Sequence, residues 1–405
     1  ISGSYNVTEV MGEVAVPIID RILNFDGAYR YSHYDVSNGQ TYNTGTYKLE
    51  LDFTPTPDIR LRGSFNRASR APNTNELFAT NYVALDGVTD PCAKTITAAD
   101  KGCLMQGLRV GQTVISNPAS QYNGYMGGNS TLRPEVAYTK TLGLVLTPHQ
   151  IRGLSLSVDY FNIKVSNAIQ SFGADAILAA CTNDLNALAC GLIHRNAAGS
   201  LWLTSDGYVT DIQTNVGWVK TSGFEFNLNY ARSAGRFGRL SFNLTGTALS
   251  EMATNNGISA SYDCAGYYGA TCGAPAPIWR HKARVMLDTP IGLQAALTWR
   301  YLGPVDVDYK NPSATLANAA YSPYSSHIGS YSYFDLMLSG KIGPHVQARL
   351  GVNNLFDKDP PLVTSGSSSG SIPSACQSTY CNGNTYPGTY DSMGRYLFAG
   401  FTFEF

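Results

Sequence analysis

The chain alternates apolar and polar residues with a period of two. In TYKLELDF, residues 46–53, tyrosine, leucine and phenylalanine alternate with lysine, glutamate and aspartate. Successive side chains of a strand point to opposite faces, so this pattern predicts strands with one apolar and one polar face. The pattern recurs in roughly thirteen segments, most about 10 residues or longer, a length suited to a tilted strand that spans a bilayer. They lie near residues 5–16, 23–34, 46–54, 59–70, 135–147, 154–166, 213–231, 239–250, 279–289, 292–302, 331–342, 345–355 and 395–405.

The connections between these segments also alternate, in length. Short turns with proline or glycine lie at 17–21, 54–58, 147–153, 233–238, 289–292 and 342–345. Every other connection is longer, and these long connections are rich in Gly, Asn, Ser and Tyr. Antiparallel strands would gather all long loops at one end, which is the pattern of an outer-membrane β-barrel with short periplasmic turns and long extracellular loops. The apolar face would then meet lipid and the polar face would line a lumen.

A soluble β-sandwich or a solenoid is the alternative fold. It would show the same alternation with the apolar face turned inward, but it would not separate its loops by length. Aromatic residues at strand ends, such as Tyr29, Tyr31 and Trp299, suit an interfacial girdle, or they pack beneath loops.

Composition narrows the class of protein further. Among 405 residues only 14% are charged and the net charge is −1, so nothing predicts a nucleic-acid partner. No apolar run is long enough for a transmembrane helix, and no signal peptide opens the chain. The odd strand count and the start at Ile1 predict that residues 1–405 are the C-terminal portion of a larger barrel, with N-terminal strands and a plug domain absent.

Eight cysteines form four close pairs, each within one long connection. Such pairs predict local disulfides in an oxidising compartment. No CxxC motif and no histidine at zinc-ligand spacing accompanies them, so neither a metal site nor a cofactor is predicted. The pairs are Cys92 with Cys103, Cys181 with Cys190, Cys264 with Cys272, and Cys376 with Cys381.

Four stretches, in this order, carry a family resemblance. They are IRLRGSFNRASRAPNTNELF (59–78), GNSTLRPEVAYTKTLGLVLTP (128–148), LSLSVDYFNIKVSNAI (154–169) and LGVNNLFDKDPP (350–361). Together with the aromatic last strand, they resemble the barrel domain of TonB-dependent outer-membrane receptors over nearly the whole chain.

The resemblance implies a fold, a location and partners. The fold would be a 22-stranded barrel, of which this chain supplies the C-terminal 13 or so strands. It would cross the outer membrane of a Gram-negative bacterium many times, among outer-membrane lipid and lipopolysaccharide. A plug and a TonB box, which have no counterpart in this sequence, would couple it to the TonB–ExbB–ExbD system. The terminal Phe405 would be read by the barrel assembly machinery.

No catalytic site emerges, and we expect the protein not to be an enzyme. GSSSG at 366–370 matches a nucleophile motif in letters only, because it lies in a Ser/Gly-rich loop instead of a strand–turn–helix. The six histidines are scattered. The stretch 173–193 has helical spacing and predicts one or two short helices, which either cap the lumen or pack within their own loop.

Ligand capture would fall to the long loops. Their tyrosines offer rigid amphipathic contacts, and Arg70 would face the lumen mouth. Arg67 would point outward near lipopolysaccharide phosphates, or be a solvated strand tip. The candidate tyrosines are Tyr262, Tyr267, Tyr268, Tyr309, Tyr321, Tyr324, Tyr380, Tyr386 and Tyr390.

The sequence therefore predicts an energy-coupled importer of a scarce, bulky small molecule, either a ferric siderophore or a carbohydrate. Alternatives are a passive pore, a hydrolase working at the lipid face, and a surface adhesin.

Overall fold

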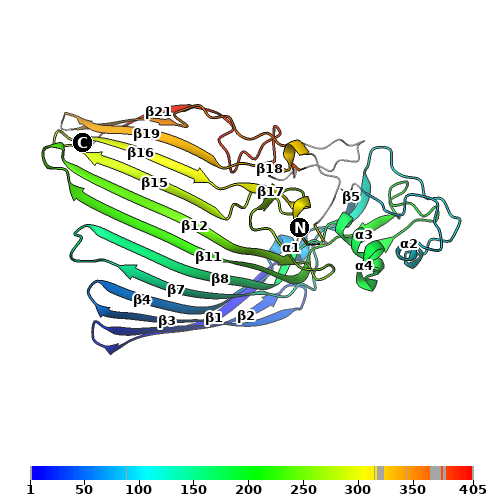
Figure 1. Ribbon diagram of the computed structural model, residues 1–405. Helices are drawn as coiled ribbons and strands as arrows, with labels where there is room; N and C mark the ends of the chain where they lie inside the picture. The colour runs from blue at the N-terminus through cyan, green and yellow to red at the C-terminus, as the bar shows by residue number, and fades with distance from the viewer. Residues whose placement is uncertain are drawn as a thin grey trace.

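A long antiparallel sheet forms the body of the computed structural model (Figure 1). The structure describes residues 2–87, 89–313, 315–316, 323–343, 345–364, 375–376 and 380–403. The long strands follow one another in chain order, each paired antiparallel with the next. They are β1 (Tyr5–Ile19), β2 (Leu23–Val36), β3 (Thr41–Thr56), β4 (Ile59–Arg70), β7 (Glu135–Leu146), β8 (Leu154–Gln170), β11 (Thr214–Ser233), β12 (Arg239–Asn255), β15 (Trp279–Asp288), β16 (Leu293–Leu302), β19 (Tyr331–Ile342), β20 (Val346–Asn353) and β21 (Tyr396–Phe403).

Shorter elements occupy the connections. The helices are α1 (Thr74–Phe78), α2 (Lys101–Met105), α3 (Ala174–Asn183), α4 (Ala187–Gly191) and the 3-10 turns η1 (Gly235–Phe237), η2 (Asp308–Lys310) and η3 (Pro323–Ser325). The short strands are β5 (Tyr82–Gly87), β6 (Tyr122–Met126), β9 (Ile193–His194), β10 (Tyr208–Thr210), β13 (Tyr262–Asp263), β14 (Tyr267–Tyr268), β17 (Val305–Val307) and β18 (His327–Ile328).

All thirteen segments predicted from the alternation are strands, and 173–193 holds helices α3 and α4. The prediction was wrong for the connection between β2 and β3, because the predicted segments 23–34 and 46–54 left a long connection of about ten residues. Pairing continues to Tyr34 opposite Tyr42 and Asp35 opposite Thr41. Because the ladder extends beyond the apolar alternation, only residues 37–40 remain as the turn.

The pairing register places like side chains in rows across the sheet. Leu61 lies opposite Phe53 on one side and Leu144 on the other, and Arg62 lies between Asp52 and Gly143. We call the two sides the apolar face and the polar face. Large side chains of the apolar face are exposed, for example Leu142 at 63% and Phe401 at 60%. This exposure contradicts the sandwich alternative, in which the same residues would be buried.

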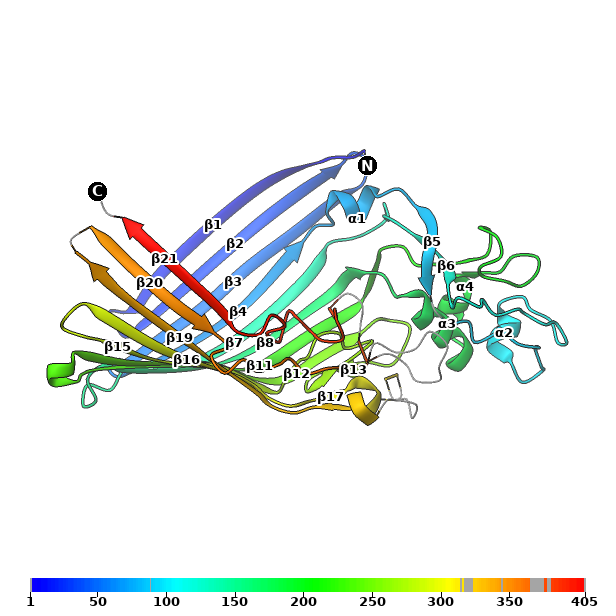
Figure 2. The same ribbon diagram turned by 90° about the horizontal axis from the view of Figure 1, so that it is seen from above.

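The sheet curves into an open trough, with β1 and β21 along its two edges (Figure 2). Within the described residues neither edge strand has a partner on its outer side. The six short turns lie at one end and the long connections at the other, which we call the long-loop end.

The long connections fold into two assemblies. The first loop assembly joins residues 71–134 to 171–213 through the sheet β5-β6-β10-β9 and a core that includes Ile177, Leu178 and Leu201. The second loop assembly joins 256–278 to 303–330 through the sheet β14-β17-β18, and the described residues of 354–395 join it through a core that includes Tyr268, Val305 and Tyr386. Each assembly therefore buries a core outside the long sheet, and Ile258 of 256–278 also packs into the core of the first assembly. In the described part of the chain, no helix has the length and apolarity needed to cross a membrane.

We predict that an arginine is tolerated on the polar face but not on the apolar face. Leu142→Arg places a charge among acyl chains and should cost about 2–4 kcal/mol of unfolding free energy. Thr139→Arg, on the polar face of the same strand, should cost under about 1 kcal/mol. Asn66 lies opposite it with a buried, unpartnered Oδ1, which can accept a hydrogen bond from the new guanidinium. Urea unfolding in lipid vesicles measures both. Equal losses would contradict the assignment of faces.

Candidate functional site

Compensated ion pairs cover the polar face of the first strands. Arg62 on β4 donates two hydrogen bonds of 2.8 Å to the carboxylate of Asp159 on β8. Arg60 donates from Nε to Asp52 on β3 at 2.6 Å. Each cation of the first strands on this face has a carboxylate in contact, so among the described residues this part of the wall carries no unpaired positive charge.

The polar face of β15 is different, because its cations have no such partners. Arg280, Lys282 and Arg284 alternate along the strand and share one face, and none forms an ion pair within the described residues. The Nε atom of Arg284 is buried without a hydrogen-bond partner. We call these three residues the cationic column.

The next strand supplies a further cation that is already neutralised. Arg300 on β16 lies directly opposite Lys282. It binds Asp335 on β19 through Nε at 2.8 Å and Asp391 through Nη1 at 2.9 Å. Asp391 belongs to the last long connection, so this pair ties the second loop assembly to the wall. The cationic column keeps an excess positive charge beside a fixed, balanced Arg300.

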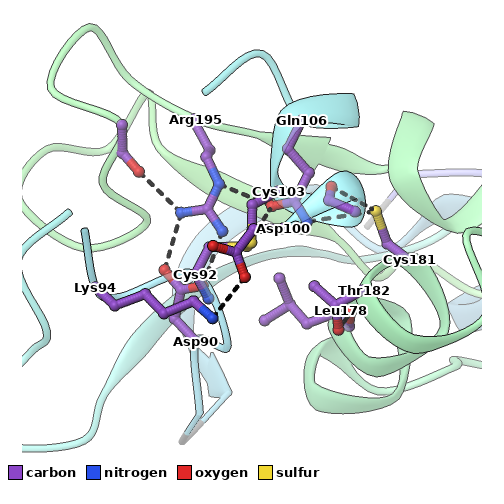
Figure 3. The surroundings of a disulfide bond; sticks show 12 residues. Asp90, Cys92, Lys94, Asp100, Cys103, Gln106, Leu178, Cys181, Thr182 and Arg195 are labelled. Carbon is purple, nitrogen blue, oxygen red and sulfur yellow. Dashed lines mark hydrogen bonds and ion pairs between the residues drawn. A yellow bond between two sulfur atoms is a disulfide. The ribbon is translucent and has the colours of Figure 1, made fainter. Parts of the chain in front are cut away.

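A buried ion pair holds the first loop assembly together (Figure 3). Arg195 donates to both oxygens of Asp90, at 2.8 and 2.9 Å, and from Nε to Gln106 at 2.8 Å. The two charged side chains are only 3% and 1% exposed. They are 105 residues apart, so the pair fixes one long connection on the other.

A second contact between these connections joins two carboxyl groups, that of Asp86 in 71–134 and that of Asp211 in 171–213. Asp211 accepts hydrogen bonds from the backbone N–H groups of Phe172 (2.8 Å) and Gly173 (3.0 Å). Gly173 has φ of 84°, a conformation that favours glycine. Burial, and then the charge of Asp211, raises the pKa of Asp86 to about 6. Two carboxyl groups thus meet at this seam, one of them holding its proton at mildly acidic pH.

Disulfides brace both loop assemblies. The bonds are Cys92–Cys103, Cys181–Cys190, Cys264–Cys272 and Cys376–Cys381, each within one connection. Among the described residues no group of three or more His, Cys, Asp or Glu side chains is arranged to hold a metal ion.

Comparison with known proteins assigns the family. The model of the family described as TonB dependent receptor-like, beta-barrel matches residues 2–355. The chain belongs to the TonB-dependent receptor β-barrel family. No curated protein sequence matches it significantly.

Solved structures with the same fold are receptors and transporters. A ferric enterobactin receptor from Pseudomonas aeruginosa shares 16% identity at a TM-score of 0.62, over 99% of this chain and 45% of that one. The siderophore receptor PirA from Acinetobacter baumannii shares 15% identity at a TM-score of 0.59, over 99% of this chain and 46% of that one. The FrpB iron transporter from Neisseria meningitidis shares 14% identity at a TM-score of 0.52, over 100% of this chain and 45% of that one. At these identities the likeness establishes the fold, and this chain spans less than half the length of each.

The family places the sheet in the outer membrane, with its apolar face toward lipid. The ligand candidate Arg70 lies at the long-loop end of β4. It binds Glu135 at 2.6 Å and Glu76 of α1 at 3.0 Å. Glu76 also completes the capping box with Asn73. Arg70 is therefore engaged in fixing α1 to the strand end.

The structure divides the candidate tyrosines by burial. Tyr268, Tyr386 and Tyr390 are packed in the core of the second loop assembly, where the rings of Tyr268 and Tyr386 meet edge to face with centroids 5.8 Å apart. A ligand would reach them only if this core opened. Tyr324 is 92% exposed and Tyr380 is 51% exposed. Tyr262, Tyr267 and Tyr309 are partly buried, and Tyr321 and Phe405 lie outside the described residues.

Sequence reasoning missed the cationic column and the Arg195–Asp90 pair. The column could have been found in the sequence, because RHKAR at 280–284 places three cations at alternate positions of a predicted strand. The ion pair has none, because its two residues lie in irregular segments far apart in sequence.

We predict that Arg195→Ala lowers the stability of the first loop assembly. It leaves Asp90 as a buried, unpaired charge, which costs about 3–5 kcal/mol. Hydrogen exchange of peptides covering 89–115 and 193–209 should rise, while the long strands stay protected. Lys94→Ala is the control, since the side chain of Lys94 is half exposed in its ion pair with Asp100, and such surface pairs are worth under about 1 kcal/mol. An equal effect of both variants would contradict the prediction.

We predict that the stability of the first loop assembly falls as pH rises through the pKa of Asp86. A carboxyl whose folded-state pKa is raised binds more protons when folded, so stability is highest near pH 4 and declines through about pH 6. Hydrogen exchange of residues 82–87, corrected for intrinsic rates between pH 4.5 and 7.5, measures this. Asp86→Asn should reduce this pH dependence, and the remainder should come from Asp211, whose pKa burial also raises. Asp100→Asn should keep the whole pH dependence, because hydrogen bonds from Lys94 and Thr97 hold the pKa of Asp100 low, at about 2.

Proposed function

We propose that this chain is the C-terminal part of an outer-membrane importer for an anionic ferric siderophore, driven by the TonB–ExbB–ExbD system. The family supports an outer-membrane receptor and transporter. Receptors and transporters for siderophores and iron share the fold. The observation in this chain that carries the choice of ligand is the cationic column on the lumen face of β15.

Electrostatics favours an anionic ligand over a neutral one. The three cations of the column have no carboxylate partners within the described residues. Alternate residues of a strand lie about 6.8 Å apart, so the column presents positive charge along roughly 14 Å of the wall. A lumen with low-dielectric walls concentrates this field and attracts anions. A ferric chelate with negative charge gains from the field, whereas a neutral carbohydrate does not.

The open edges of the sheet support a larger barrel. Unpaired backbone groups of β1 and β21 cannot persist in hydrocarbon, where no water satisfies them. The structures that share the fold are more than twice as long as this chain. We infer that further strands close the sheet and that a plug gates the lumen, which distinguishes an importer from a passive pore.

We predict that neutralising the cationic column weakens capture. Lys282→Gln with Arg284→Gln removes two charge-assisted contacts and should raise the Kd for an anionic ferric chelate at least about tenfold. Uptake of radioactive iron by cells that lack the native gene and carry each variant measures transport. Lys341→Gln, on the same face near the short-turn end, is the matched control.

The same cells separate the alternatives. Uptake that persists after dissipation of the proton-motive force would indicate a passive pore. Competition by a neutral oligosaccharide, with no effect of the double variant, would indicate a carbohydrate receptor.

A further inference from the structure

Four basic residues form a row on the lipid-facing side of the sheet. They are Arg67 on β4, Lys140 on β7, Lys164 on β8 and Lys220 on β11, four strands that are adjacent in the sheet. All lie toward the long-loop end of their strands. We call them the outer basic row.

The pairing register shows that these side chains share one face. Arg67 lies opposite Tyr138, Tyr138 opposite Lys164, and Lys164 opposite Lys220. Lys140 lies opposite Phe65, two residues closer to the short-turn end, on the same face. Residues opposite each other point to the same side of a sheet, so the row continues the column of Leu142 and Leu144 below it.

Charge is rare on this side of the protein. Elsewhere the lipid-facing positions of the described long strands carry only Asp35, Glu251 and Arg232, apart from two histidines, as the register assigns them. Glu251 binds Lys220 at 2.6 Å. Within the described residues no carboxylate contacts Arg67, Lys140 or Lys164. Four cations and one acid leave a local excess of positive charge.

Aromatic residues hold the stems of these cations at the surface. The ammonium of Lys164 lies 4.9 Å from the ring centre of Trp218, and that of Lys140 lies 5.9 Å from that of Phe65. Arg67 donates to the hydroxyl of Tyr138 at 3.4 Å and to the carbonyl of Gly45. Tyrosine and tryptophan mark the membrane–water interface, so the row lies at headgroup level.

The arrangement has an electrostatic cost that an anion would relieve. Lys164 and Lys220 are directly opposite each other, and like charges in such pairs destabilise a sheet. Neighbouring strands lie about 4.8 Å apart, so Arg67 and Lys164 are separated by roughly 10 Å of backbone, with Lys140 diagonal to both. A headgroup that carries more than one phosphate can contact several of these donors at once, and the arginine fork suits a phosphate.

We propose that the outer basic row is a binding site for the phosphorylated headgroup of lipopolysaccharide, whose acyl chains would cover the apolar strip below. The row is on the opposite face from the cationic column, so this site is independent of the transported ligand. A lipid bound here spans β4, β7, β8 and β11, the strands that carry the first loop assembly.

The test compares lipid retention by matched variants. The triple variant Arg67→Gln, Lys140→Gln and Lys164→Gln should lose lipopolysaccharide affinity by roughly a hundredfold, at about fivefold per charge. Native mass spectrometry of the purified protein, titrated with lipopolysaccharide, measures the affinity. Arg232→Gln, on the same face at the short-turn end, should bind as the unaltered protein does. Heat-modifiable migration on gels checks that each variant is folded.

Two further arms identify the bound group. Lipopolysaccharide stripped of its lipid A phosphates should bind the unaltered protein as weakly as the triple variant binds intact lipopolysaccharide. Phosphatidylglycerol should bind at least tenfold more weakly than lipopolysaccharide. Unchanged affinity in the triple variant, equal binding of the stripped lipid, or equal binding of phosphatidylglycerol would each overturn the proposal.

Discussion

The fold depends on one constraint, which is that backbone N–H and C=O groups in hydrocarbon must find partners in the protein. An antiparallel ladder satisfies them strand by strand and leaves the side chains to alternate between two faces. The long strands of this β-barrel chain follow chain order without a crossover, so each ladder forms between neighbours in sequence. Lipid contact then requires only that alternate residues be apolar, with no packed core on that side. This explains how Leu142 and Phe401 can be exposed in a stable protein.

The loops obey a different rule, because they fold in water. Both loop assemblies bury small cores of their own, and disulfides within the connections limit the freedom of the unfolded loops. Contacts such as Arg300 with Asp391 join a loop core to the wall at a few points. The loops can therefore respond to pH or to a ligand while the sheet stays fixed. The seam at Asp86 and Asp211 is suited to such a response, since protonation changes a contact between two connections without touching a long strand.

The sequence was sufficient for the strands and insufficient for the loops, for a physical reason. Period-two alternation is a local signal, and chain-order pairing makes the sheet readable from it. A loop core has no period, and its decisive contacts join distant residues such as Asp90 and Arg195. Tyrosine content alone could not separate buried from exposed rings, because Tyr268 and Tyr324 both lie in aromatic-rich loops and differ in what packs around them. The cationic column could have been predicted from the sequence, but only by counting positive and negative residues separately for each face of every strand.

Whether a cation of a long strand meets lipid or the lumen depends on which of the two alternating faces its position belongs to. Lys164 and Lys282 are both exposed lysines within long strands, yet the register turns one to lipid and the other to the lumen. Arg62, at a lumen-facing position of β4, is neutralised by Asp159, whereas Arg67, at a lipid-facing position of the same strand, has only neutral acceptors. A slip of one residue would exchange these surroundings and place bare charges against acyl chains. The unpaired cations, which are the cationic column and Arg67, Lys140 and Lys164 of the outer basic row, therefore reinforce the register, since each is tolerable only on the face where an anion can reach it.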